Sequence, residues 1–150
     1  MPAHAMNHFT ILTKDVAATQ DFYSDILGLK VGYRPPITRP GAWMYAGEQA
    51  VLHVIDPIEM PQNPNGVLDH MAFSATGLGD VAAKLKQRGV RYELSQQGET
   101  GTWQMFFLDV NGAKVELNFE KDEPAAQALK TESARMARGE WRPGDAGSKE

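Results

Sequence analysis

The sequence contains no cysteine among its 150 residues. Disulfide bonds, thiolate nucleophiles and thiolate metal ligands are therefore excluded, and any metal ion must be bound by nitrogen and oxygen atoms. No apolar run approaches the roughly 18 residues of a membrane-spanning helix. The first residues, 1–7, also lack the basic and apolar regions of a signal peptide. We therefore expect no membrane association and a cytoplasmic location.

Positive charge is also scarce, because 15 Lys and Arg residues stand against 19 Asp and Glu residues and give a net charge of −4. A protein with this balance is not expected to bind nucleic acid or an anionic membrane surface. The hydrophobic fraction of 42% and the charged fraction of 23% are ordinary for a globular protein. The chain is long enough for one domain with a sizeable core.

The order of the predicted elements repeats once along the chain, as strand, helix and three further strands. Apolar alternation predicts the strands, and apolar stripes at helical spacing predict the helices. The first half is predicted to contain a strand at 7–12, a helix at 15–27 and strands at 30–33, 42–46 and 50–55. The second half is predicted to contain a strand at 68–74, a helix at 77–88 and strands at 90–94, 104–108 and 113–119.

Short turn signals support these boundaries. Asp15 is a plausible helix N-cap, and Gly28 stands where a C-cap glycine belongs. Asn111 and Gly112 predict a two-residue hairpin between the last two strands. After residue 120 the composition favours a further helix at 124–138, followed by a frayed tail.

Four residues of ligand type occupy equivalent places in the two halves. His8 and His70 lie on the first strand of each half, and His53 and Glu116 lie on the last. An ionised Glu116 among apolar neighbours is costly unless a positive group holds it. If the halves pair, imidazole and carboxylate groups gather around one point and suit Fe, Mn, Co, Ni or Zn. The structural alternatives are an ion pair of Glu116 with Lys114 or an arginine, and histidines that simply pack in the sheets.

The repeat and several motifs resemble the vicinal oxygen chelate superfamily. This superfamily contains glyoxalase I, extradiol ring-cleaving dioxygenases, fosfomycin-resistance enzymes and bleomycin-binding proteins. The motifs are the helix start Asp15-Val16 with Phe22-Tyr23, Leu27-Gly28-Leu29, Leu68-Asp69-His70, and Asp109 with Asn111-Gly112 and Glu116.

The resemblance implies an α+β fold, in which two βαβββ modules with curved mixed sheets surround a metal-binding cleft. It implies a single domain over residues 7–120, with modules of about 7–56 and 68–120. Residues 1–6 are then an N-terminal extension, and 121–150 are a C-terminal helix and a flexible tail. Members of the superfamily are usually homodimers, and we expect the same here.

The resemblance also assigns roles to the four residues. His8, His70 and Glu116 match the three metal ligands of the extradiol enzymes. His53 falls where glyoxalase I has a fourth, acidic ligand and where extradiol enzymes have an acid–base histidine. Two histidines and one carboxylate suit Fe(II), with Ni, Mn, Co or Zn as other candidates.

The predicted activity is that of a metal-dependent enzyme acting on a small molecule chelated through adjacent oxygens. A dioxygenase-like reaction is favoured, although Phe106 and Val110 stand where the extradiol pattern has tyrosine and proline. One alternative is a glyoxalase I-like lyase or isomerase with His53 as fourth ligand or base. Another is a metal-free, bleomycin-type binding protein. Fosfomycin resistance ranks lower, because few basic residues accompany the predicted site.

The predicted substrate is an aromatic or otherwise planar small molecule. Arg34, in a proline-rich loop, is placed to reach a substrate carboxylate. The aromatic residues and one methionine on the central strands either line the pocket or simply fill the sheet faces. The candidate pocket residues are Arg34, Trp43, Tyr45, Trp103, Met105 and Phe107.

Overall fold

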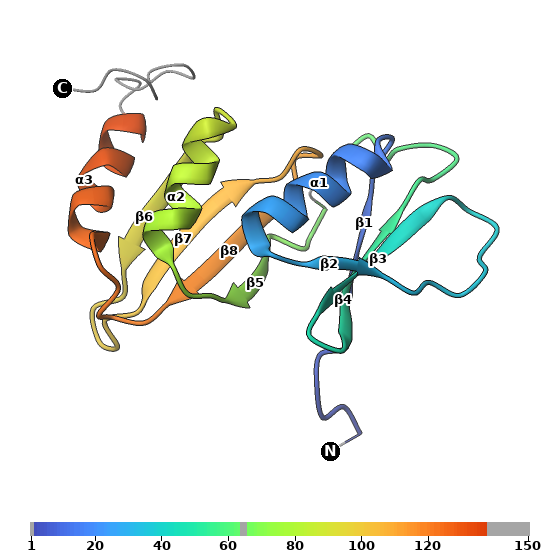
Figure 1. Cartoon of the computed structure of the whole chain (residues 1–150), viewed down its shortest axis with the longest axis horizontal. Coiled ribbons are helices and arrows are strands. Elements are labelled where there is room, and N and C mark those ends of the chain that lie inside the picture. Colours follow the sequence, from blue (N-terminus) through green and yellow to red (C-terminus); the bar gives the residue numbers. More distant parts are fainter. Residues whose placement is uncertain (1, 64–65, 138–150) are drawn as a thin grey trace. The chain divides into compact units, whose positions relative to one another are not determined.

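The computed structural model describes residues 2–63 and 66–137. The chain forms two compact units, Met1–Gly66 and Val67–Glu150, which we call the N-terminal unit and the C-terminal unit (Figure 1). The predicted flexible tail falls on residues 138–150, which lie outside the described residues.

The N-terminal unit is a four-stranded mixed sheet with a helix. Its elements are β1 (Phe9–Leu12), α1 (Val16–Leu27), β2 (Lys30–Gly32), β3 (Gly41–Ala46) and β4 (Gln49–Ile55). The strand order in space is β1-β4-β3-β2. Strand β1 runs parallel to β4, whereas β3 is antiparallel to both of its neighbours.

The C-terminal unit repeats this arrangement and adds a further helix. Its elements are β5 (Met71–Ser74), α2 (Leu78–Gln87), β6 (Tyr92–Gln96), β7 (Trp103–Leu108), β8 (Lys114–Phe119) and α3 (Ala126–Ala137). The strand order β5-β8-β7-β6 is that of the first sheet, again with one parallel pair, β5 and β8. The prediction of an α+β fold with two βαβββ modules is confirmed.

The strand registers place the four candidate residues at equivalent positions. On the parallel pair of the first sheet, Thr10 lies opposite His53. On the parallel pair of the second sheet, Ala72 lies opposite Glu116. Since His8 and His70 each precede those residues by two positions, and strand side chains alternate, each histidine shares a face with its partner on the last strand.

Helix α1 begins and ends where the sequence predicts. The Asp15 carboxylate accepts the backbone N–H of Ala18 at 2.9 Å, and Gly28 takes the left-handed φ of 70° that ends the helix. Phe22 and Tyr23 are fully buried in the unit. Burying a side chain of this size stabilises the fold by about 1.5–3 kcal/mol.

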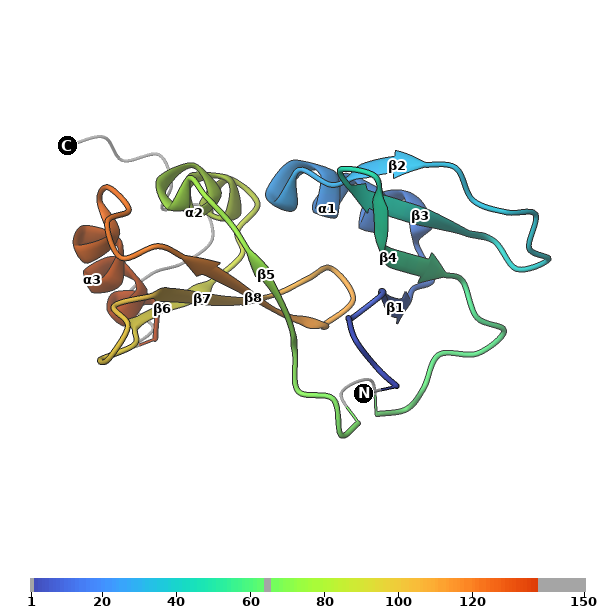
Figure 2. The ribbon, with the colours of Figure 1, turned by 90° about the horizontal axis from the view of Figure 1, so that it is seen from below.

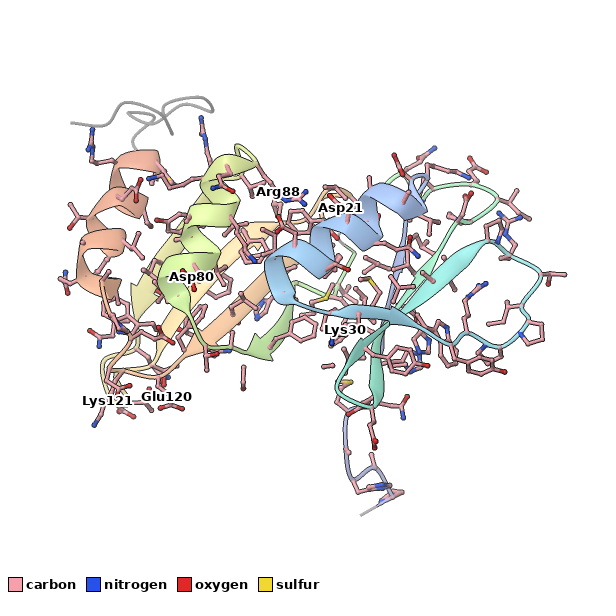
Figure 3. All side chains as sticks on the ribbon, in the orientation of Figure 1. Asp21, Lys30, Asp80, Arg88, Glu120 and Lys121 are labelled. Atoms are coloured by element: carbon pink, nitrogen blue, oxygen red, sulfur yellow. The ribbon has the colours of Figure 1, made fainter. Side chains whose placement is uncertain are left out.

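Helix α2 starts in a different way, because its N-cap residue is Gly77 and has no side chain to accept a hydrogen bond. The Glu123 carboxylate accepts the backbone N–H groups of Gly77 and Leu78 at 3.0 and 3.1 Å instead. Asp80 adds a second negative charge in the first turn (Figure 3). Both carboxylates lie at the positive end of the helix dipole and interact favourably with it.

Each sheet has one face turned to the core and one open face. In β3, Ala42 and Met44 are buried, and in β4 Leu52 and Val54 are buried. The equivalent strands of the other unit bury a similar apolar layer. It consists of Trp103, Met105, Phe107, Val115, Leu117 and Phe119. Figure 2 shows helix α2 on one side of strands β6, β7 and β8.

The hairpin between β7 and β8 has a three-residue loop, so the predicted two-residue turn is wrong. The N–H of Asp109 donates to the carbonyl of Ala113 at 2.8 Å. Gly112 takes a φ of 83°, whereas Asn111 does not take a positive φ. The Asp109 carboxylate accepts the N–H groups of Asn111 and Ala113, both at 2.8 Å, and this side-chain turn replaces the tighter one.

The extra loop residue shifts the strand pairing by one position. Phe106 lies opposite Glu116 in the observed register. A two-residue loop at Asn111 and Gly112 would have placed Phe107 there instead. Because a shift of one residue reverses the two faces of a strand, the loop decides which side chains of β7 accompany Glu116.

Helix α3 covers the outer edge of the second sheet. It was predicted at 124–138 and is observed at Ala126–Ala137, beside α2 (Figure 1). The backbone N–H of Leu94, on edge strand β6, donates to Ser133 Oγ at 2.8 Å. Lys86 of α2 also pairs with Glu132 of α3 at 2.6 Å. The first contact satisfies one backbone N–H of the edge strand, and the packing of α3 on β6 covers an edge that could otherwise pair with another strand.

Among the described residues, no helix has both the length and the apolar character required to cross a membrane.

Candidate functional site

In the N-terminal unit, three rings form a stack across the open face of the sheet. The rings of His8 and His53 are 3.7 Å apart between centroids, with an interplanar angle of 16°. Trp43 lies on the other side of His53, at 4.0 Å and 7°. Trp43 and His53 are also direct cross-strand partners on β3 and β4. The structure therefore brings together three of the residues that the sequence analysis selected.

The electrostatic surroundings of His53 favour its neutral form. Partial burial lowers the pKa of His53 below its usual value, and the nearby His8 and Arg34 lower it further. A backbone hydrogen bond with Ala50 opposes the shift. A neutral imidazole keeps a lone pair on one nitrogen, which can accept a proton or bind a metal ion.

Arg34 and Tyr45 lie in the same unit and are held by backbone carbonyls. Arg34 Nη2 donates to the carbonyl of Arg39 at 2.9 Å, and its buried Nε has no hydrogen-bond partner among the described residues. The guanidinium lies against Gly41, where a Cβ would be 3.0 Å from Nη2. Tyr45 donates to the carbonyl of Tyr33 at 2.6 Å. These contacts fix both side chains of the predicted pocket.

In the C-terminal unit, His70 and Glu116 are in direct contact. His70 Nε2 lies 2.6 Å from Glu116 Oε2. The other carboxylate oxygen, Oε1, accepts a hydrogen bond from Gln104 Nε2 at 2.8 Å. Glu116 is only 6% exposed, so these two partners compensate for the burial of its carboxylate. The partners of the Glu116 carboxylate are therefore His70 and Gln104, whereas Lys114 pairs with Asp69.

Phe106 and Asp69 hold His70 from two other sides. The Phe106 ring stands edge-on to the imidazole at 5.5 Å between centroids. Asp69 Oδ2 lies 2.7 Å from His70 Nδ1 and 3.3 Å from Lys114 Nζ. The hydrogen bond with His70, and then that with Lys114, lower the pKa of the Asp69 carboxyl group.

The predicted pocket residues on β7 do not accompany this pair. Trp103, Met105 and Phe107 are 4%, 0% and 3% exposed and belong to the core, where a substrate does not reach. Gln104 and Phe106, which the sequence analysis did not select for the pocket, face His70 and Glu116 instead. The reason is the one-residue register shift that the three-residue hairpin imposes.

Imidazole and carboxylate donors of this kind suit a divalent transition metal. The structure brings the donors together in pairs, His8 with His53 in one unit and His70 with Glu116 in the other. Within residues 2–63 and 66–137, no three His, Cys, Asp or Glu side chains form a single group that could hold an ion. The assembly of His8, His70 and Glu116 as one ligand set therefore stays a prediction.

Comparisons with known proteins identify relatives over most of the chain. Residues 5–117 match the family model described as Glyoxalase/Bleomycin resistance protein/Dioxygenase superfamily. The protein "Glyoxylase I 4" of Arabidopsis thaliana is 29% identical over 133 residues, which cover 77% of this chain and 72% of the relative.

Two solved structures have similar folds. A glyoxalase family protein from Enterococcus faecalis has a TM-score of 0.61 and 28% identity, over 79% of this chain and 99% of its own. The lactoylglutathione lyase from Agrobacterium tumefaciens has a TM-score of 0.58 and 20% identity, over 81% of this chain and 97% of its own. The second likeness concerns the fold alone.

Proposed function

Because the chain belongs to the Glyoxalase/Bleomycin resistance protein/Dioxygenase superfamily, we propose that it is a divalent-metal-dependent enzyme of the glyoxalase type. Its substrate is a small molecule that presents adjacent oxygens to the metal ion. Its reaction begins with a proton transfer from the bound substrate. This transfer leads to isomerisation of the substrate, or to the formation or cleavage of one of its bonds. The similarity to the Arabidopsis "Glyoxylase I 4" supports this choice over the dioxygenase-like reaction that the sequence analysis favoured.

The proposed metal ligands are His8, His70 and Glu116. A bound divalent ion supplies a Lewis acid that polarises the substrate oxygens. Gln104 holds one oxygen of Glu116 and leaves Oε2 turned toward Nε2 of His70, so the donor atoms of this pair already face each other. The candidate ions for this donor set are Ni, Zn, Fe, Mn and Co.

The single observation that carries the proposal is the stacked position of the His53 ring between the rings of His8 and Trp43. Partial burial, and then the neighbouring His8, lower the pKa of His53, and this shift favours the neutral form that a general base requires. The stack holds the ring in a fixed orientation beside a proposed ligand. His53 is therefore the proposed base, and coordination of the ion by His53 is the alternative role.

An Fe(II) dioxygenase is the second candidate function. Two histidines and one carboxylate are the ligand set that non-haem iron oxygenases use. Against it, the residue opposite Glu116 is Phe106, which has no hydroxyl group to donate a hydrogen bond to a substrate. A metal-free binding protein is the non-enzymatic candidate, favoured by the direct contact that His70 and Glu116 make with each other.

Metal analysis of protein purified without oxygen, followed by reconstitution with Ni(II), Zn(II) and Fe(II), separates these candidates. We expect metal-dependent isomerisation of a hemithioacetal formed from a thiol and a 2-oxoaldehyde. Oxygen consumption with catechols in the Fe(II) form alone would instead support the dioxygenase. Ligand binding that is unaffected by a chelator would support the binding protein.

Substitutions test the ligand assignment directly. His70→Ala and Glu116→Ala should each abolish metal retention, whereas His4→Ala, at an exposed position outside the repeat, should retain it. Full metal occupancy in both of the first two variants would show that the assignment is wrong. The expected homodimer, which rests on the family, is checked by the molar mass in solution.

A further inference from the structure

Each proposed ligand histidine follows a residue whose side-chain oxygen lies at its Nδ1 atom. Asn7 Oδ1 is 2.7 Å from Nδ1 of His8, and Asp69 Oδ2 is 2.7 Å from Nδ1 of His70. The two contacts occur in different units and at equivalent positions of the repeat. The same arrangement has therefore formed twice within one chain.

The chemistry of these contacts determines where the ring proton lies. An amide oxygen and a carboxylate oxygen only accept hydrogen bonds, so Nδ1 must be the protonated nitrogen in both rings. The lone pair of a neutral ring is then on Nε2. In the C-terminal unit, this nitrogen lies 2.6 Å from Oε2 of Glu116, so the two atoms share a proton until a metal ion takes its place.

We propose that Asn7 and Asp69 are positioning residues, which select Nε2 of His8 and His70 as the metal-binding nitrogen. This inference rests on the proposed function, because it concerns the same metal ligands. The other two histidines follow Ala3 and Leu52, whose side chains cannot accept a hydrogen bond. Among the four histidines, only His8 and His70 have this contact, and each stands immediately before the first strand of its unit, β1 or β5.

The two positioning residues differ in charge, which makes the two histidines unequal ligands. Asp69 is a carboxylate and also contacts Lys114, whereas Asn7 is a neutral amide. A carboxylate that accepts from the outer nitrogen makes an imidazole a stronger donor to a metal ion than a neutral amide does. His70 is therefore the stronger ligand of the two, and His8 the weaker.

Nitrogen-15 magnetic resonance of the histidine rings tests the tautomers. In the metal-free protein at alkaline pH, His8 should carry its proton on Nδ1, and Asn7→Ala should move it toward Nε2. His4, which follows an alanine, is an internal reference and should show the Nε2-protonated form in both proteins. His70 is observed in the Zn(II)-loaded protein, because Glu116 competes for its Nε2 proton when no metal is bound. A His8 ring that is already protonated on Nε2 in the unsubstituted protein would overturn the proposal.

Zn(II) affinity tests the consequence for binding. Asp69→Ala and Asn7→Ala should each weaken binding by about 10- to 100-fold. Asp69→Asn keeps an accepting oxygen and should lose less than Asp69→Ala, and Asn7→Asp should bind Zn(II) more tightly than the unsubstituted chain. The control is Asp122→Ala, which removes an exposed carboxylate from a turn of the same unit and should have no effect.

Two outcomes distinguish failure of this inference from failure of the proposed function. If the protein binds no Zn(II), the proposed function fails, while the His8 spectrum still decides the tautomer. If Zn(II) binds and Asp69→Asn is as weak as Asp69→Ala, the accepting oxygen is not what matters, and the positioning role is refuted.

Discussion

Phe106 and Glu116 are direct cross-strand partners on β7 and β8, and their side chains share the open face of the second sheet. The Phe106 ring is also the edge-on neighbour of His70, and Lys114 Nζ lies 5.2 Å from its centroid. One aromatic ring therefore contacts a proposed ligand and a nearby cation.

Phe106→Leu should destabilise the protein by about 0.5–1.5 kcal/mol, because it removes the ring contact with His70 while keeping most of the apolar volume. Urea denaturation of the metal-free protein measures the change. Phe106→Tyr keeps the ring and serves as the matched variant. An equal loss in both variants would mean that the ring contact is not the source of the stability.

Gly41→Ala should destabilise the protein by about 1–3 kcal/mol, because the new Cβ would lie 2.1 Å from the carbonyl oxygen of Val54 and against the Arg34 guanidinium. The matched control is Gly79→Ala in α2, where a Cβ meets nothing within 4 Å. That control should instead be more stable, by up to about 1 kcal/mol. Thermal unfolding of both variants measures whether Gly41→Ala loses stability and Gly79→Ala gains it.

The repeat could be predicted from the sequence because both halves carry independent local signals of the same kind. Asp15 and Gly28 mark the ends of α1 through their own side-chain and backbone chemistry, and the structure agrees with them. The spacing along the sequence also predicts that His8 corresponds to His70 and His53 to Glu116. The observed strand registers agree with this correspondence.

The hairpin register could not be predicted, because the dipeptide Asn111-Gly112 is compatible with loops of two or three residues. The carboxylate of Asp109 favours the longer loop by accepting two backbone N–H groups. In the register that this loop sets, Trp103, Met105 and Phe107 lie in the core, and Gln104 lies beside Glu116. The faces of a whole strand therefore depended on one side chain in a turn.

Glu123→Ala should destabilise the protein by about 0.5–2 kcal/mol, since it leaves two backbone N–H groups at the start of α2 without their acceptor. Composition after residue 120 predicts a helix but not this long-range cap. Glu123→Gln keeps the oxygen and should lose only the charge effect, about 0.3–1 kcal/mol. The exposed Glu120, in the same turn (Figure 3), provides the control variant Glu120→Ala, which should be neutral.

The Tyr92 hydroxyl makes stability depend on pH at the alkaline end. Burial, and then the charge and hydrogen bond of Glu132, raise the pKa of Tyr92 above its ordinary value of 10.0. A group with a raised pKa stabilises the fold fully below its unfolded value and loses that contribution as the pH rises above it. Tyr92→Phe should therefore weaken the fall in stability that begins near pH 10 and continues as the pH rises further. Urea denaturation at several pH values gives the free energy of unfolding of both proteins. An equal fall of this free energy with pH in the two proteins would contradict the prediction.

His53→Gln should separate the two roles that remain for this residue. If His53 is the general base, the variant keeps the metal content of the unsubstituted enzyme, and kcat falls by about 100- to 10,000-fold. The stacked position between His8 and Trp43 should tolerate the change, because glutamine fills much of the same space without a titrating ring. Metal analysis and steady-state kinetics on the same preparation provide both measurements. A variant that loses its metal ion as Glu116→Ala does would instead identify His53 as a fourth ligand. The expected result leaves the ion in place, because the proposed ligands are His8, His70 and Glu116, and His53 stacks against His8 as the proposed base.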